Sequence, residues 1–162
     1  MIYTVIDIET TGGSHGNRIT EIAAVKTDGL RILDSYETLV NPEIFIPESI
    51  TLLTGITNAM VQRAPLFEDI ADDLVAFLDN TVFVAHNVTF DYGIVKNHFE
   101  DLGYTFNKKK LCTVRLARTV LPGHASYSLG KLCTDLGIKN HSRHRAMGDA
   151  KATVELFHHI IT

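Results

Sequence analysis

The stretch VIDIETTGG, residues 5–13, combines the pattern of a central strand with two acids. Three of its apolar residues are typical of a buried strand, namely Val5, Ile6 and Ile8. Asp7 and Glu9 are two residues apart, so a strand places both carboxylates on one face. A buried carboxylate without a partner is costly enough that it normally shifts its pKa or binds a cation. The stretch therefore predicts a core strand that carries a ligand site.

The first forty residues predict an antiparallel meander. Alternating apolar residues favour strands at 2–8, 18–27 and 31–40, and Asp28 with Gly29 suits the hairpin turn between the last two. A fourth apolar strand, TVFVAH, covers 81–86. Helical patterns cover the following ranges: short pieces at 47–53 and 57–61, then 67–79, 88–102, 112–121, 128–136 and 146–161. This order of elements predicts an α/β layered domain.

Composition is ordinary for a globular protein, and we expect one domain over residues 1–162. Hydrophobic residues make up 45% of the 162 residues and charged residues 21%. No apolar run approaches the length of a membrane span, and no signal-peptide pattern follows Met1, so we expect a cytoplasmic protein. Two isolated cysteines, Cys112 and Cys133, are too few for a structural zinc site and indicate reduced thiols.

Charge is distributed unevenly along the chain. The net charge is −4, yet residues 101–151 hold ten Lys/Arg against three acids. A basic segment on an acidic body can contact a short run of phosphates without coating duplex nonspecifically. A solvated basic face without a partner explains the same pattern equally well.

Two further acids have positions that indicate a site. Asp91 ends HNVTFD, in the first turn of the helix that leaves the strand at 81–86, and open α/β sheets bind ligands at this end of their strands. Asp149 is followed at helical spacing by residues that turn it toward the core: Thr153, Leu156 and Ile160. Either acid alone has an ordinary explanation, as a first-turn acid or as a partner of a nearby arginine.

The four acids together favour a metal site. Several inward carboxylates without matching inward bases leave a charge deficit that divalent cations would cancel. Oxygen ligands suit Mg²⁺ or Mn²⁺, and the lack of a Cys/His cluster argues against zinc. His144 lies five residues before Asp149, about 140° away around a helix, so we expect it in the loop before the last helix. There it could accept a proton from an attacking water at neutral pH, although spacing alone does not choose between His144 and His141.

The sequence resembles the DEDDh family of 3′–5′ exonucleases. The likeness rests on three motifs in order, DIETTG (7–12), HNVTFD (86–91) and HRAMGD (144–149), and is greatest to the epsilon proofreading subunits of bacterial DNA polymerase III. It covers essentially the whole chain, including LTGIT (53–57), which is similar to a segment near the substrate's terminal nucleotides. One departure is Gly148, which weakens the helix start by about 1 kcal/mol relative to Ala and indicates either a mobile loop or a close packing contact.

The resemblance implies a fold and a set of site residues. The fold is a ribonuclease H-like mixed five-stranded sheet, with an antiparallel three-strand meander plus parallel strands, flanked by helices. Two divalent metal ions, Mg²⁺ or Mn²⁺, would be held by four ligands: Asp7, Glu9, Asp91 and Asp149. With these acids, His144 would be catalytic as the general base. The terminal nucleotide would be contacted by Thr10, Thr11, Gly12, Leu53 and Asn87, whereas Phe90 is expected in the core.

The implied function is metal-dependent 3′–5′ hydrolysis of single-stranded or frayed DNA ends, releasing nucleoside 5′-monophosphates. An exoribonuclease of the oligoribonuclease or ribonuclease T type is the alternative, because no residue here reveals a contact to a 2′ hydroxyl. A noncatalytic module that binds nucleic acid or a polymerase is less consistent with five intact catalytic positions. A DNA polymerase is a candidate partner, although we expect no separate polymerase-binding tail after the last helix.

Overall fold

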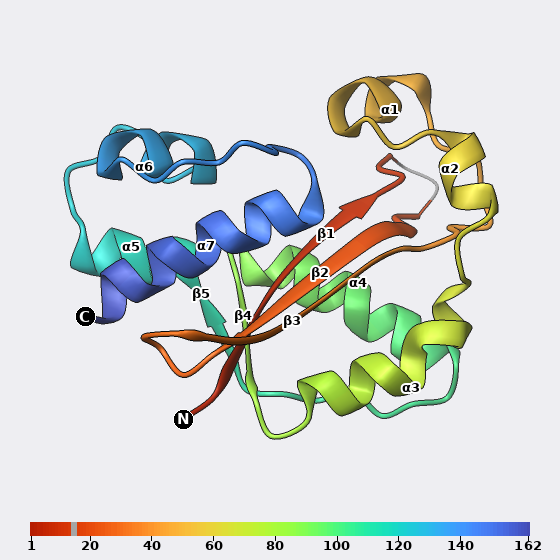
Figure 1. The fold of residues 1–162 in the computed structure, drawn as a ribbon, viewed down its shortest axis with the longest axis horizontal. Coiled ribbons are helices and arrows are strands. Elements are labelled where there is room, and N and C mark those ends of the chain that lie inside the picture. The colour runs from red at the N-terminus through yellow and green to blue at the C-terminus, as the bar shows by residue number, and fades with distance from the viewer. Residues whose placement is uncertain (14–15) are drawn as a thin grey trace.

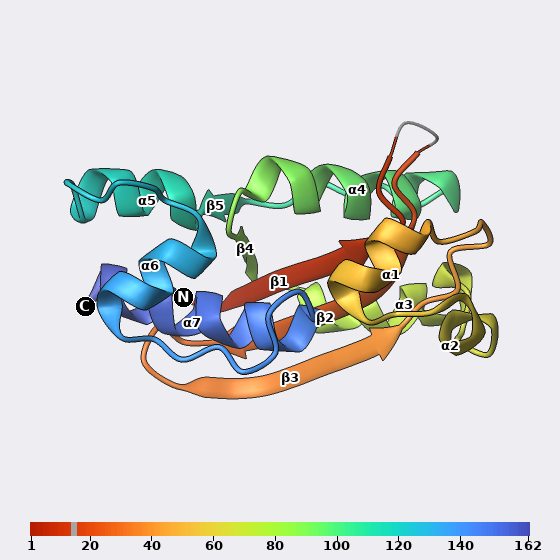
Figure 2. The same ribbon diagram turned by 90° about the horizontal axis from the view of Figure 1, so that it is seen from above.

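The computed structural model describes residues 1–13 and 16–162, which form one five-stranded sheet with helices on both faces (Figures 1 and 2). The strands are β1 (Tyr3–Thr10), β2 (Ile19–Thr27), β3 (Ile32–Leu39), β4 (Val82–Ala85) and β5 (Lys110–Cys112). The helices are α1 (Glu48–Thr54), α2 (Asn58–Gln62), α3 (Phe67–Leu78), α4 (Val88–Asp101), α5 (Thr113–Val120), α6 (Leu129–Leu136) and α7 (Ala146–Ile161). The predicted elements are therefore present, with ends that differ from the prediction by at most two residues.

The sheet has the strand order β3-β2-β1-β4-β5. The three N-terminal strands form the predicted antiparallel meander, and β4 and β5 run parallel to β1. The mixed five-stranded fold is confirmed. The sequence pattern did not locate the fifth strand, β5, because its three residues are too few to display a period of two. It pairs with β4 through Phe83 and Lys110, directly before α5 begins.

Side chains of β1 alternate between two apolar layers, and this alternation positions the acids. Ile6 and Ile8 pack with α3 and α4 on one face of the sheet. Val5 packs on the other face with apolar residues of α7, including Ala150 and Val154. Asp7 and Glu9 follow Val5 at steps of two, so both carboxylates lie on the face that α7 covers.

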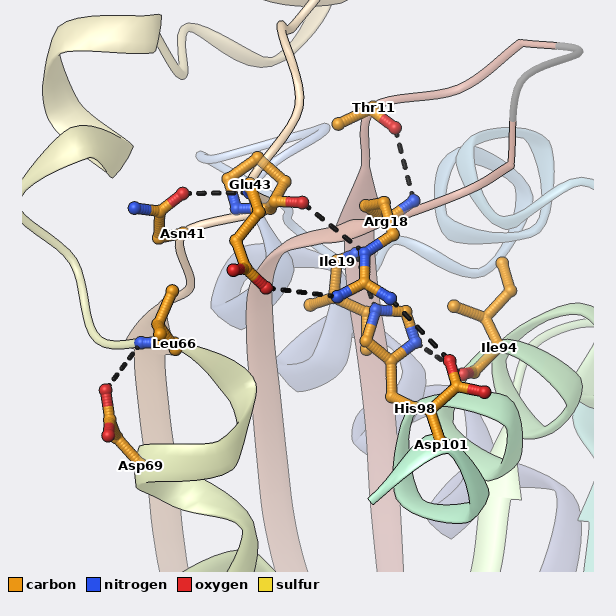
Figure 3. Close-up of polar contacts among 11 residues, drawn as sticks. Thr11, Arg18, Ile19, Asn41, Glu43, Leu66, Asp69, Ile94, His98 and Asp101 are labelled. Carbon is orange, nitrogen blue, oxygen red and sulfur yellow. Dashed lines mark hydrogen bonds and ion pairs between the residues drawn. The ribbon is translucent and has the colours of Figure 1, made fainter.

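Thr11, directly after β1, is attached to the start of β2 and from there to α4 (Figure 3). The Arg18 backbone N–H donates to Thr11 Oγ1, and the Arg18 guanidinium lies 3.8 Å from a carboxylate oxygen of Asp101 on α4. His98, which is buried, accepts the Ile19 N–H at its Nε2, 3.2 Å away. These contacts fix Thr11 relative to the core. Within the described ranges, no helix combines the length and apolar character that crossing a bilayer requires.

Candidate active site

Three of the predicted metal ligands converge between β1 and α7. Asp7, Glu9 and Asp149 each offer one carboxylate oxygen, and these atoms lie within 4.8 Å of one another. The Asp7 Oδ2 atom is fully buried and has no hydrogen-bond partner among the described residues. An unpartnered buried carboxylate oxygen is costly unless a cation or proton accompanies it.

The acids raise one another's pKa values. Burial, and secondly the charge of Asp91, raises the pKa of Asp7 well above its ordinary value. Burial raises the pKa of Glu9 to about 8, with further contributions from Asp149 and Glu21. Burial also raises the pKa of Asp91 to about 8. Without a cation, the site therefore favours protonated acids, because the ionised forms repel one another in a poorly solvated place.

Asp91 lies in the first turn of α4, as predicted, and is buried. Its Oδ2 accepts the backbone N–H of Ile8 at 3.2 Å, which ties the start of α4 to β1 beside Asp7. The Asp91 carboxylate is not one of the three that lie within 4.8 Å of one another. The helix begins after Asn87, whose φ of 69° is left-handed, a conformation that Asn tolerates better than most residues.

The loop before α7 holds both carboxylate oxygens of Asp149. The Asn140 Nδ2 donates to Oδ1 at 2.7 Å, and the His144 backbone N–H donates to Oδ2 at 3.0 Å. His144 precedes the helix, as predicted, with a left-handed φ of 61°. It lines a cavity of ≈ 210 Å³ together with Asp149. His141 is exposed, and it does not line that cavity.

Glu21 supports the start of α7, and our sequence analysis missed it. This carboxylate on β2 is 6% exposed and faces Glu9 in the strand register. Its oxygens accept the Arg145 guanidinium at 2.7 Å and the Ala146 backbone N–H at 2.7 Å. Helix α7 therefore begins on a buried acid of the sheet, which positions Asp149 one turn later. The sequence signal that could have indicated Glu21 was its position as an acid within the apolar run ITEIAAV.

The residues expected at the terminal nucleotide lie at the carboxyl end of β1 and near it. Thr10 and Thr11 are buried, and Gly12 has a φ of 65°. A Cβ on Gly12 would lie 2.8 Å from Ile50 of α1, so a larger residue does not fit there without a shift. Leu53 of α1 is 52% exposed and available for contact.

One expectation about this region was wrong. Phe90 was expected in the core, but it is 44% exposed. Phe90 lies on the exposed side of the first turn of α4, because Val88 and Asp91 occupy the buried side of that turn.

The site fits a divalent cation. Its donors are carboxylate oxygens, the ligands that Mg²⁺ and Mn²⁺ prefer, and one buried oxygen lacks a partner within the described chain. The neighbouring Arg145 is already paired with Glu21, so it is not free to neutralise the cluster.

Known proteins are similar in sequence to this chain over nearly its full length. The exonuclease family profile (RNase T) matches residues 4–157. The PolC-type DNA polymerase III of Clostridium perfringens is 43% identical over 95% of this chain, which corresponds to 11% of that protein. The DNA polymerase III subunit epsilon of Aquifex aeolicus is 37% identical over 96% of this chain and 78% of its own length. The chain thus spans about a tenth of the PolC-type relatives.

Solved structures confirm the fold. Exonuclease X in complex with 5′ overhanging duplex DNA has a TM-score of 0.80 at 29% identity, covering 98% of this chain and 90% of that one. The nuclease domain of 3′hExo, a DEDDh family member bound to rAMP, has a TM-score of 0.85 at 19% identity, covering 99% and 91%. The family indicated by the three motifs is thereby confirmed, and the chain belongs to the exonuclease (RNase T) family, with a DEDDh exonuclease among its structural neighbours.

Proposed function

We propose that the chain is a metal-dependent 3′–5′ exonuclease that removes nucleoside 5′-monophosphates from single-stranded or frayed DNA ends. One observation carries the proposal: carboxylate oxygens of Asp7, Glu9 and Asp149 lie within 4.8 Å of one another, and Asp7 Oδ2 is buried without a partner in the described chain. A cluster of this kind attracts divalent cations, because its ionised carboxylates repel one another unless a cation lies between them.

The four acids would hold two divalent ions, Mg²⁺ or Mn²⁺: Asp7, Glu9, Asp91 and Asp149. Bound divalent ions would make a coordinated water more acidic and would stabilise the negative charge on the leaving 3′ oxygen. The protein's part is to fix the donors in advance. Asp91 is attached to β1 through Ile8, and Asp149 is attached to its own loop through Asn140.

His144 would accept the proton of the attacking water. An imidazole suits this role, because one ring nitrogen of its neutral form is an acceptor that can take up a proton. The bond from its backbone N–H to Asp149 holds this residue next to one of the acids that bind the ions. The bond thus fixes the backbone that carries the proposed base relative to a proposed metal ligand.

The polymer is DNA in this proposal. Two relatives are named as DNA polymerase III proteins, and Exonuclease X was solved with DNA. A DNA polymerase is accordingly the proposed partner, in a cytoplasmic setting. Hydrolysis of RNA is the second candidate, because the similar 3′hExo nuclease domain was solved with rAMP.

The test is an assay on 5′-labelled single-stranded DNA and RNA of one sequence, with Mg²⁺, Mn²⁺ or EDTA. We expect a ladder that shortens from the 3′ end, is lost in EDTA and in Asp7→Ala, and is strongly slowed in His144→Ala. His141→Ala is the matched control, since this exposed histidine lies in the same loop, and it should cleave like the wild type. Intact substrate in every metal lane, from folded protein, would overturn the proposal.

A further inference from the structure

The two sides of the acid cluster differ in charge. Between Arg31 and Arg63 the sequence contains no Lys or Arg, and this stretch includes α1 and α2. Helices α5 and α6 carry three, Arg115, Arg118 and Lys131, against one acid, Asp135. Figure 2 shows α1 and α2 toward one end of the molecule and α5 and α6 toward the other. A polyanion that enters the site is therefore attracted from the side of α5 and α6.

A polar cleft lies on that side and opens next to the acids. It measures ≈ 720 Å³, and it is lined by Asn87, Arg115, Arg118 and Ser128, among others. None of its lining residues, all within the described chain, is an acid. Ser128 also lines the smaller cavity that contains His144 and Asp149. The cleft and the candidate active site are therefore adjacent, with Ser128 at the junction.

Two arginines in this cleft have no acidic partner within the described ranges. Arg115 and Arg118 are exposed, one turn apart on α5. Among the described residues, no carboxylate oxygen lies within 4.0 Å of either guanidinium, whereas several other cations are paired: Arg18, Arg31, Lys96, Lys131 and Arg145. Their charges remain available to a ligand, and guanidinium groups suit phosphate oxygens particularly well.

The wall of the cleft is fixed in place. Arg118 lies over the ring of Tyr127, with 5.8 Å from its Cζ to the ring centroid. The Tyr127 carbonyl accepts a hydrogen bond from His86 Nε2 at 2.7 Å, so the other ring nitrogen, Nδ1, accepts the Thr113 hydroxyl in neutral His86. Burial lowers the pKa of His86, which favours this neutral form. One histidine thus joins β4, the start of α5 and the loop before α6.

We propose that the cleft bearing Arg115 and Arg118 binds the backbone phosphates of nucleotides on the 5′ side of the scissile bond. This proposal rests on the exonuclease function and specifies the path of its substrate. The terminal nucleotide lies toward α1, and the strand leaves across Ser128 to α5. Recognition through phosphates is independent of base sequence, and it demands a single strand of several nucleotides rather than a free nucleotide.

The test measures binding by fluorescence anisotropy in an Asp7→Asn background, with labelled thymidine dinucleotide and octanucleotide. Replacing both Arg115 and Arg118 by Ala should weaken octanucleotide binding by about tenfold or more and leave dinucleotide binding within about twofold. The slope of log affinity against log salt should fall by about 1.4, as expected for two lost phosphate contacts on a single strand. Arg63→Ala, an exposed arginine on the α2 side, is the matched control and should change neither value.

A second substrate separates this proposal from the exonuclease function. The p-nitrophenyl ester of thymidine 5′-monophosphate has no nucleotides on the 5′ side, so its hydrolysis by the wild type reports the catalytic centre alone. If the wild type hydrolyses it and the double variant binds octanucleotide as tightly as its parent, the path across α5 is overturned while the function stands. If the wild type hydrolyses neither ester nor oligonucleotide, the function fails, whatever the binding result.

Discussion

Gly148 of α7 offers a sharp test of how the candidate active site is positioned. A Cβ at this position would lie 2.3 Å from the backbone oxygen of Ser142. Ordinary contact begins at 3.4 Å, so a Gly148→Ala variant must displace the Ser142 backbone by about 1 Å. Ser142 lies in the loop that carries Asn140 and His144, both of which bond to Asp149. The displacement therefore reaches the proposed general base, His144, and a proposed metal ligand, Asp149, together.

Stability and activity should respond differently to this change. Alanine gains about 1 kcal/mol of helix propensity over glycine, and overpacking costs about 1–3 kcal/mol. The two terms largely offset each other, so the free energy of unfolding should fall by about 2 kcal/mol at most. A misplacement of about 1 Å in a reacting group can cost about 100-fold in rate. We therefore expect kcat/KM to fall by about 100-fold in a protein that remains folded.

The assay compares urea unfolding and kcat/KM on single-stranded DNA for a series of glycine variants. Gly93→Ala on α4 is the matched control, since its Cβ would meet nothing within 4 Å; this variant should gain about 1 kcal/mol and keep its activity. Gly130→Ala on α6 is intermediate, because the atoms nearest to its Cβ belong to the movable guanidinium of Arg143. If Gly148→Ala behaves like Gly93→Ala in both measurements, the argument from close packing is refuted.

Three further predictions concern the charges of the site. In EDTA, stability should fall as pH rises from 7 to 8, because burial raises the pKa of Asp91 from 3.8 to about 8 and the folded state then holds a proton that the unfolded state has lost. The loss between pH 7 and 8 is about 1 kcal/mol for Asp91 and smaller for the partly buried Glu9, and a melting temperature that does not fall over this range in EDTA would contradict it. Asp7→Asn should raise the melting temperature in EDTA at pH 8, because it removes a buried carboxyl that keeps a proton in the folded state after the unfolded state has lost it, and it should abolish the proposed DNA cleavage; a lower melting temperature would argue against this cost of burial. Glu21→Gln should cost about 1–3 kcal/mol in urea unfolding, because it leaves Arg145 without its carboxylate, and an unchanged unfolding midpoint would count against a supporting role.

Regular patterns allowed much of the fold to be predicted. The last helix was expected at 146–161 and is observed at Ala146–Ile161, because sixteen residues contain several repeats of its apolar face. The step of two between Asp7 and Glu9 correctly placed both acids on one sheet face. The three residues of β5 contain no such repeat, so only pairing with β4 reveals them as a strand.

Contacts between distant parts of the chain were not predictable in the same way. Glu21 and Arg145 are separated by 124 residues, and neither has a local pattern that indicates the other. Asn140 bonds to Asp149 only because the loop before α7 folds back on the helix. Phe90 was assigned to the core from its apolar character, but the first turn of α4 leaves it at the surface. Motif spacing indicates which acids gather, whereas the partners that hold them depend on tertiary packing.

The origin of the site acids in separate elements has a consequence for synthesis of the protein. Asp7 and Glu9 come from the first strand, Asp91 from a central helix, and Asp149 from α7, the last one. Helix α7 reaches the acids by packing on β1 and β2. A chain emerging from the ribosome therefore lacks a complete site until nearly all of the domain has been translated. On the proposed function, a partly translated chain lacks the acid that α7 supplies and does not hydrolyse nucleic acids.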